Sequence, residues 1–428
     1  MTVAVERALT VASAGCHSIN MSDAVRSVAN ATAIKSSQAL TRPAAVLDPD
    51  QCSLDDFRAL VEVPTDLADY PLADRIELGA VVYEMAALAD RVGGAPSASP
   101  RLRNEIAAAL SDGPGIIVLA GGVDPEVVDR ASAVFFDLIE AERSTDGPVG
   151  DHFAKAGAND RVWNALEKLA VAAPEVYVDY YANEALALGA LAWLGPAYAL
   201  TSQVNVVNPG GEAQLPHRDY HLGFMTDERA AQYPRHAHRV SPVLTLQGAI
   251  AHSEMPTETG PTMYLPGSQR YELGYLAWRR PEFIEYFAKH HVQVPLRPGD
   301  VVFFNPAMFH GAGTNRTADV RRMANLLQIS SAMGIALEAV NRTRMVEATY
   351  ETMAARLADG LDPLLVGHAA AATAQGYAFP TNLDRDQPVG SLTPHSQLDL
   401  VLDGLGRGVG FDELQVALAA HNQRRQTH

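Results

Sequence analysis

Hydrophobic positions recur at two different spacings along this chain, and the change between them divides the sequence into parts. Apolar residues follow a helical spacing at about 54–112, again up to about residue 200, and once more after 336. Between about 202 and 335 the apolar runs are short, rich in β-branched residues and separated by turn signals. The pattern therefore predicts a central unit of short strands with helices before and after it.

One strand and one helix are expected between the first helical region and this central unit. The run "PGIIVLAGGV" from residue 114 has the composition of a strand, and Asp124 then caps a helix whose first residue is Pro125. The sequence that follows, including "NDRVWNALEKLAVAAPEV", is interpreted as further helices up to about residue 200.

The predicted fold class is α+β. Short strands at regular spacing with turns between them are typical of an antiparallel sandwich or barrel, which binds ligands in its mouth. We expect a double-stranded β-helix (a jelly-roll, cupin-like core) flanked by N- and C-terminal helices. The expected parts are a loosely ordered N-terminal arm (1–45), a helical N-terminal part (46–112), the jelly-roll domain with its supporting helices (113–335), and a C-terminal helical extension (336–428).

Charge and hydropathy narrow the range of partners. The chain has 50 acidic and 33 basic residues, a net charge of −17, so its surface should repel nucleic acid and anionic membranes. Its most apolar run, 186–200, is interrupted by Pro196 and is shorter than the ~20 residues that a membrane-spanning helix needs. We therefore expect neither a nucleic acid nor a membrane as partner.

Cysteine usage bears on the compartment. The two cysteines, Cys16 and Cys52, are far apart in the sequence and form no C-x-x-C motif. Neither a disulfide framework nor a thiolate metal site is indicated, and the N-terminal run carries Glu6 beside Arg7, which does not fit a secretory signal. A reducing cytoplasm is the expected location.

The stretch "PHRDYHLGF" contains candidate metal ligands. His217 and Asp219 are two residues apart, so on a strand they would project from the same face. His310 ends the apolar run "LRPGDVVFFNPAMFH", which predicts a second strand that the fold must bring alongside. Two histidines and one carboxylate can form a facial triad on a non-haem Fe(II), leaving three positions open for substrate and oxygen.

An arginine completes the candidate site. Arg321 lies eleven residues after His310, where the chain would return to the mouth on the following strand, and its planar fork suits a carboxylate. Adjacent residues on a strand face opposite ways, so only one of Arg321 and Arg322 can point inward. The spacing favours Arg321, which should then share the inward face with Met323.

Together these motifs resemble a known family, the phytanoyl-CoA dioxygenase group of Fe(II)- and 2-oxoglutarate-dependent oxygenases. The similarity covers roughly 110–335 and rests on the H-x-D, "TGPTMYLPGS", "LRPGDVVFFNP", the distal histidine and the arginine eleven residues on. It implies that His217, Asp219 and His310 bind Fe(II) and that Arg321 anchors the far carboxylate of 2-oxoglutarate. Asn205, on the preceding strand, is expected either to hydrogen-bond this cosubstrate or to be a polar strand-end residue.

The resemblance also implies a reaction. O2 and 2-oxoglutarate would be consumed, succinate and CO2 released, and an unactivated C–H of a small-molecule, natural-product or amino-acid-type substrate hydroxylated. Because Asp219 is present, hydroxylation is favoured over halogenation, for which relatives replace this carboxylate by a small residue. Two positions depart from the family pattern: Gln269 stands where a histidine often follows "PGS", and Ala312 stands where a hydroxyl residue is common.

Several alternatives remain open at this point. His221 continues the face of the H-x-D, and His236 with His238 form an H-x-H, but each is better explained without a metal. The basic segment 227–240 could be a lid that recognises an anionic substrate group. The rival function is a non-oxidative metal isomerase, hydrolase or binding module on the same scaffold, since fold does not fix function. The oligomeric state is left open.

Overall fold

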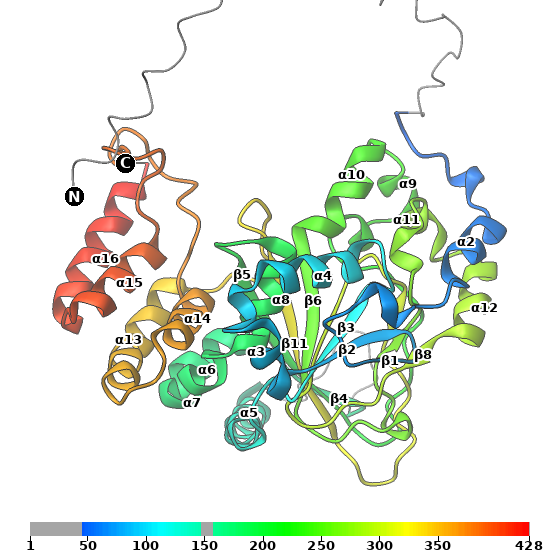
Figure 1. Ribbon diagram of the computed structural model, residues 1–428, viewed down its shortest axis with the longest axis horizontal. Helices are drawn as coiled ribbons and strands as arrows, with labels where there is room; N and C mark the ends of the chain where they lie inside the picture. Colours follow the sequence, from blue (N-terminus) through cyan, green and yellow to red (C-terminus); the bar gives the residue numbers. More distant parts are fainter. Residues whose placement is uncertain (1–44, 147–156, 428) are drawn as a thin grey trace, which may run out of the picture. The chain divides into compact units, whose positions relative to one another are not determined.

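The computed structural model describes residues 45–146 and 157–427, and the described residues from Val46 onward form one compact unit (Figure 1). The N-terminal arm expected at residues 1–45 lies outside the described residues, except for the last one. Val46 and the described residues after it belong to a single unit. The boundaries at 112 and 335 stay a prediction.

A mixed eight-stranded sheet is the centre of this unit. Adjacent strands of this sheet run antiparallel, except β2 and β3, which run parallel. In spatial order the strands are β1 (Arg75–Glu77), β2 (Ala80–Glu84), β3 (Ile116–Ala120), β9 (Val301–Phe304), β6 (Thr245–Ala251), β11 (Arg322–Ser330), β5 (Ala199–Val207) and β4 (Asn159–Val162).

A small sheet of three strands faces the main one. It consists, in order, of β10 (His310–Gly311), β7 (Met263–Tyr264) and β8 (Val292–Gln293). A buried apolar cluster contains Val118 and Val302 of the main sheet together with Tyr264 of the small one, so the two sheets share a core. The expected mixture of helices and sheet is confirmed, but the main sheet is open rather than closed.

Helices cover the other face of the main sheet. The largest core joins the side chains of Leu119, Val204 and Met323 to helical residues on both sides in the sequence. The longer helices are α2 (Leu54–Val61), α3 (Met85–Val92), α4 (Pro100–Ser111), α5 (Pro125–Asp146), α6 (Ala165–Ala172), α7 (Pro174–Tyr181), α8 (Glu184–Leu194), α12 (Pro281–His290), α13 (Arg342–Ala358), α14 (Pro363–Thr373), α15 (Gln397–Arg407) and α16 (Phe411–Arg425). Helices α13–α16 form a group to one side of the sheet (Figure 1).

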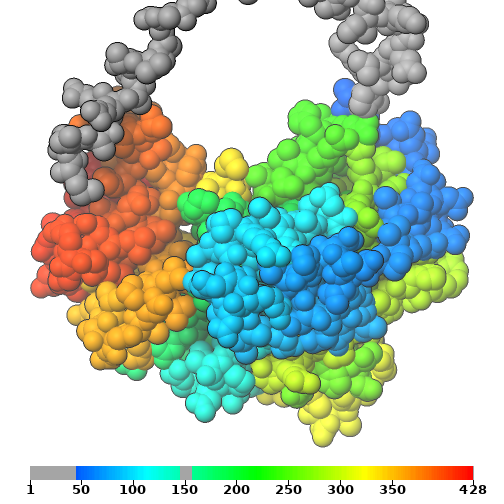
Figure 2. All heavy atoms as spheres, viewed as in Figure 1, coloured from blue at the N-terminus to red at the C-terminus, as the bar shows by residue number. Residues whose placement is uncertain are grey.

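Two predicted helical regions contain strands as well as helices. The expected helical part 46–112 supplies β1 and β2, which extend the main sheet through β3, and Figure 2 shows this blue-to-cyan segment over much of one face. Residues 159–162, expected to be helical, form β4 against β5. The segment "NDRV" has one apolar residue, so no periodicity could reveal it.

The most apolar run does not form a single helix. Helix α8 ends at Leu194, Gly195 has a positive φ of 74°, and β5 begins at Ala199. Among the described residues, no helix is long and apolar enough to cross a membrane.

Candidate metal centre and its pocket

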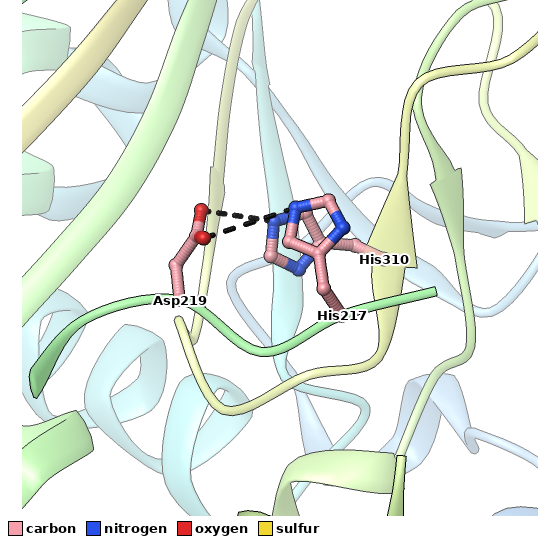
Figure 3. A group of neighbouring side chains, drawn as sticks. All are labelled: His217, Asp219 and His310. Carbon is pink, nitrogen blue, oxygen red and sulfur yellow. Dashed lines mark ion pairs between the residues drawn. The ribbon is translucent and has the colours of Figure 1, made fainter. Parts of the chain in front are cut away.

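His217, Asp219 and His310 come together in space. Each offers a ligand atom, and these atoms all lie within 4.8 Å of one another. The Nε2 atom of His217 is 3.8 Å from Asp219 Oδ1, and that of His310 is 3.4 Å from Asp219 Oδ2. Figure 3 shows the carboxylate facing both imidazole rings. The three candidate ligands predicted from the sequence are therefore neighbours in the structure.

The backbone brings the two histidines together. His217 and His310 form an antiparallel bridge in which each backbone N–H donates to the other residue's carbonyl, at 2.9 and 3.2 Å. The H-x-D stretch is otherwise not the strand that its alternation predicted. Tyr220 and His221 have positive φ values of 61° and 43°, and the chain turns into a short 3-10 helix, His221–Phe224.

Both imidazole rings are held in the orientation that a metal needs. His217 Nδ1 lies 3.0 Å from the Leu215 carbonyl, and His310 Nδ1 lies 2.9 Å from the Met308 carbonyl. A carbonyl can only accept, so Nδ1 carries the hydrogen in each ring and Nε2 keeps its lone pair. Burial, then the neighbouring His310, lowers the pKa of His217, which favours the neutral ring that can bind a metal.

The carboxylate is kept ionised. Burial alone would raise the pKa of Asp219, but the proximity of His310 and His217 and the amide of Gln247 outweigh burial and hold the pKa below its usual range. Gln247 Nε2 donates to Asp219 Oδ2 at 2.5 Å. This bond orients the carboxylate, as the outer partners of metal ligands commonly do.

A buried arginine lies between the two ligands of the H-x-D. Arg218 is 2% exposed, and its Nη2 donates to the carbonyls of Ser268 and Tyr271 at 2.6 and 3.0 Å. Its guanidinium lies 5.0 Å from the ring centroid of Tyr275 and 5.2 Å from that of Phe309, the residue before His310. Arg218 therefore ties the H-x-D to the segment that carries the distal histidine.

Arg218→Met should lower the free energy of unfolding by about 2–4 kcal/mol, because two charge-assisted hydrogen bonds and the contacts with two rings are lost. Denaturation in urea measures this. Arg58→Met is the matched control, since Arg58 is half exposed and forms a surface ion pair with Glu62, four residues on. Equal losses in the two variants would contradict the role of Arg218.

The triad opens into a cavity of about 290 Å³ between the two sheets. Its walls combine apolar side chains such as Met255 and Leu296 with polar ones from β4, β5, β6 and β11. Arg322, at the start of β11, also lines this cavity and is 6% exposed. A cavity with apolar walls and a few polar groups is the usual form of a small-molecule site.

Arg322 is a buried cation that lacks a counter-ion among the described residues. No described carboxylate pairs with it, and its Nη1 atom has no hydrogen-bond partner. Burial lowers its pKa to about 10, opposed only by nearby Tyr264. Because an unpaired buried charge is costly, this position calls for an anion in the cavity.

The expected inward position of Arg321 is wrong. Its side chain is 42% exposed, its Nη2 pairs with Asp160 at 3.2 Å, and its guanidinium lies 4.8 Å from the ring centroid of Phe136. The alternation along the strand was correct, but the assignment of the faces was reversed. Met323 packs into the core on the helix side of the sheet, so the residue before it must face the cavity.

Asn205 and Arg161 are two further polar residues that line the cavity. Asn205 was singled out from the sequence, but Arg161 was not. Asn205, on β5, lines the cavity, and its Oδ1 lies 3.4 Å from Asn159 Nδ2. Arg161, on β4, was missed with its strand, although it also lines the cavity. Arg161 donates to Gln203 Oε1 at 2.8 Å and lies 4.7 Å from the ring centroid of Trp163, so its charge is already accommodated.

The other candidate histidines lie outside the triad. His221 contacts Ser241 Oγ at 3.1 Å, and buried His238 contacts the Ala230 carbonyl at 3.1 Å. His236 is exposed in α10 (Arg235–Val240).

Two of the three arginines in residues 227–240 already form ion pairs. Arg235 and Arg239 both form ion pairs with Glu272. An anion-binding lid would need free cations, so these pairs weaken the hypothesis that residues 227–240 recognise an anionic substrate group.

The two departures from the family motif have different consequences. Gln269 Nε2 donates to the Gly113 carbonyl at 2.9 Å, so this residue ties the turn to the segment before β3. Ala312 lines the cavity and brings no hydroxyl group to it. The first substitution is structural, and the second leaves the cavity wall locally apolar.

Comparison with known proteins gives a family and distant relatives. Residues 111–323 match the family model described as phytanoyl-CoA dioxygenase (PhyH). The dioxygenase cdmD of Talaromyces verruculosus is 29% identical over 130 residues, which cover 30% of this chain and 36% of that protein. The dioxygenase trt7 of Aspergillus terreus is 30% identical over 128 residues, 30% of this chain and 39% of that protein. The matches thus span less than two fifths of these relatives.

Similarity to solved structures is more remote. AviO1 from Streptomyces viridochromogenes Tue57 has a TM-score of 0.39 at 20% identity, covering 55% of this chain and 96% of that one. The non-heme alpha ketoglutarate dependent epimerase SnoN from nogalamycin biosynthesis has a TM-score of 0.36 at 20% identity, covering 54% and 82%. At this level, neither likeness establishes a shared reaction or substrate.

Proposed function

Residues 111–323 belong to the phytanoyl-CoA dioxygenase family, and from that premise we propose that the protein is an Fe(II)- and 2-oxoglutarate-dependent dioxygenase acting on a small molecule. Iron and 2-oxoglutarate are the cofactor and cosubstrate supported by the family and by the two histidines and the carboxylate gathered at one point. We infer further that the two facing sheets form an open version of the expected jelly-roll.

One observation carries this proposal: the same cavity contains the metal triad and a buried arginine without a counter-ion. His217, Asp219 and His310 would hold iron, and the donor set fits Fe(II) because it is the two-histidine, one-carboxylate facial triad. Arg322 would bind the far carboxylate of 2-oxoglutarate, since that anion would supply the missing charge. Asn205 remains a candidate for a second polar contact to the cosubstrate.

The chemistry divides between the bound groups and the chain. When bound, iron and 2-oxoglutarate supply the oxidising power: decarboxylation to succinate and CO2 provides two of the electrons that reduce O2, and the substrate provides the other two. The chain's own residues orient and enclose the reactants. The Leu215 and Met308 carbonyls fix the two rings, Gln247 fixes the carboxylate, and the apolar walls limit access of water.

Hydroxylation of an unactivated C–H is the outcome that we propose. Asp219 occupies the carboxylate position of the triad, so no space is left there for a halide. Asp219 is already held ionised and hydrogen-bonded, which suits a permanent ligand rather than a proton carrier. The reaction therefore needs no general base from the chain.

A non-oxidative isomerase, hydrolase or binding module is the rival proposal. Such a protein needs the metal but does not need a buried arginine that binds a carboxylate in the same cavity. Arg322 favours the oxygenase, because burying its charge would be unfavourable without an anionic ligand.

With Fe(II) and 2-oxoglutarate under anaerobic conditions, the protein should develop the visible charge-transfer band of a metal-bound 2-oxo acid, and admission of O2 should yield succinate even without substrate. Both signals should disappear when a chelator removes the iron. A protein that binds Fe(II) but shows neither the band nor succinate would put the rival function ahead.

A further inference from the structure

Two glutamines form a cross-strand pair on the cavity wall. Gln247 of β6 and Gln328 of β11 are direct partners in the antiparallel register, so their side chains project from the same face of the sheet. Both line the cavity. Gln247 is 6% exposed, and Gln328 is half-buried.

Each of these amides has an oxygen that accepts no hydrogen bond from the described residues. The orientation of the Gln247 amide is fixed, because its Nε2 donates to the ionised Asp219 and its Oε1 must therefore point away from that carboxylate. The other two glutamines that line the cavity differ, because Gln203 Oε1 accepts from Arg161 and Gln214 Oε1 accepts from the Ala312 N–H. Buried acceptors without partners are rare in native proteins, so the pair calls for hydrogen-bond donors from a ligand.

The cosubstrate is not that ligand. Gln328 lies six residues beyond Arg322 on the same strand, which at 3.3 Å per residue is about 20 Å. A five-carbon dicarboxylate anchored at Arg322 and bound to the metal cannot also reach Gln328. The pair instead lies beside Asp219, next to the position where a metal would oxidise its substrate.

The surroundings of the pair are apolar. Phe224 and Leu337 line the cavity and are 57% and 40% exposed, which places them where the cavity meets solvent. Leu326 and Ala249 form the next cross-strand pair on the same wall. A ligand held by the glutamines would therefore have a mainly apolar body with two polar points.

We propose, resting on the function above, that Gln247 and Gln328 select the substrate: a rigid, mainly apolar skeleton that carries two hydrogen-bond donors, hydroxyl or N–H, about 5 Å apart, the spacing of neighbouring strands. Gln247 has a second task, the orientation of Asp219. Among the described residues, Gln328 forms no side-chain hydrogen bond with a triad residue or with Arg322, so it is the residue that isolates substrate selection.

Three bicyclic probes of similar size test this: naphthalene-1,3-diol, with hydroxyls about 5 Å apart, 1-naphthol and naphthalene. Equilibrium dialysis would use the full chain loaded anaerobically with Fe(II) and 2-oxoglutarate. The wild type should bind the diol about 3- to 10-fold more tightly than 1-naphthol, the usual value of one neutral hydrogen bond. In Gln328→Leu this ratio should fall to within twofold, and in the exposed control Gln423→Leu it should be retained.

Binding of 2-oxoglutarate, measured in each variant beforehand, separates a failure of the proposed function from a failure of the glutamine pair. If the wild type does not bind 2-oxoglutarate, the proposed function fails. If 2-oxoglutarate binds but the wild type does not prefer the diol, binds none of the probes, or keeps its preference in Gln328→Leu, the glutamine pair does not select the substrate.

Discussion

Arg322→Ala should weaken 2-oxoglutarate binding about 30- to 1000-fold, because a buried charge-assisted carboxylate pair is worth roughly 2–4 kcal/mol. Iron binding should persist, since Arg322 is not among the triad. Arg321→Ala is the matched control on the adjacent residue, whose side chain is 42% exposed and pairs with Asp160. It should change 2-oxoglutarate affinity only a few-fold.

Titration of each variant with 2-oxoglutarate at fixed Fe(II), followed by the anaerobic charge-transfer band, decides between the two arginines. The reverse ranking would mean that the anion binds outside the cavity. Equal and small effects would leave Arg161 as the other cation of the cavity wall. Arg161 is the weaker candidate, because Gln203 and Trp163 already contact its guanidinium.

Asp219→Ala, His217→Ala and His310→Ala should each reduce iron affinity by about 100-fold or more and abolish succinate formation. Loss of an outer partner of a metal ligand typically costs 10- to 100-fold, and loss of the ligand itself should exceed that. Asp219→Ala would also remove the carboxylate to which Gln247 Nε2 donates. Iron content after desalting and succinate yield are the measurements.

His236→Ala and Asp129→Ala, both exposed and outside the cavity, are the controls and should keep their iron and activity. Unfolding curves should show that the three triad variants remain folded, since each residue lies at the cavity wall rather than in the apolar core. Full succinate formation in any triad variant would remove that residue from the metal centre.

The sequence was sufficient to predict which residues form the triad but not how the backbone presents them. His217 and Asp219 are two residues apart, and His310 ends an apolar strand, so their meeting could be inferred from spacing and topology. The positive φ values at Tyr220 and His221 could not, because neither residue type signals a left-handed backbone. The prediction of an extended strand at the H-x-D was therefore wrong, although the three candidate ligands lie together as predicted.

The exchange of Arg321 and Arg322 has a more general cause. A period of two separates the residues of a strand into two faces but does not say which face is inside, and in β11 both are largely buried. The residue types on the two faces would have shown which face lies toward the cavity. Met323, Leu327 and Ile329 form an apolar face that suits packing against helices, which leaves Arg322 and Gln328 to the polar cavity.

Strand β4 shows where sequence patterns cannot suffice. Its four residues contain one apolar side chain, Val162, and a helix follows almost at once. Only pairing with β5 makes this segment a strand, and such long-range pairing leaves no local trace. Arg161 was missed for that reason, and with it a second cation of the cavity.

The reciprocal backbone bridge between His217 and His310 has a consequence for how the centre is assembled. Two main-chain hydrogen bonds already set the separation of these ligands, so a metal entering the site would order little of the chain around it. A metal would then enter a site that the backbone has already formed, and its binding would not drive folding. We therefore expect that a chelator can remove the iron and that added Fe(II) can restore it without unfolding of the chain.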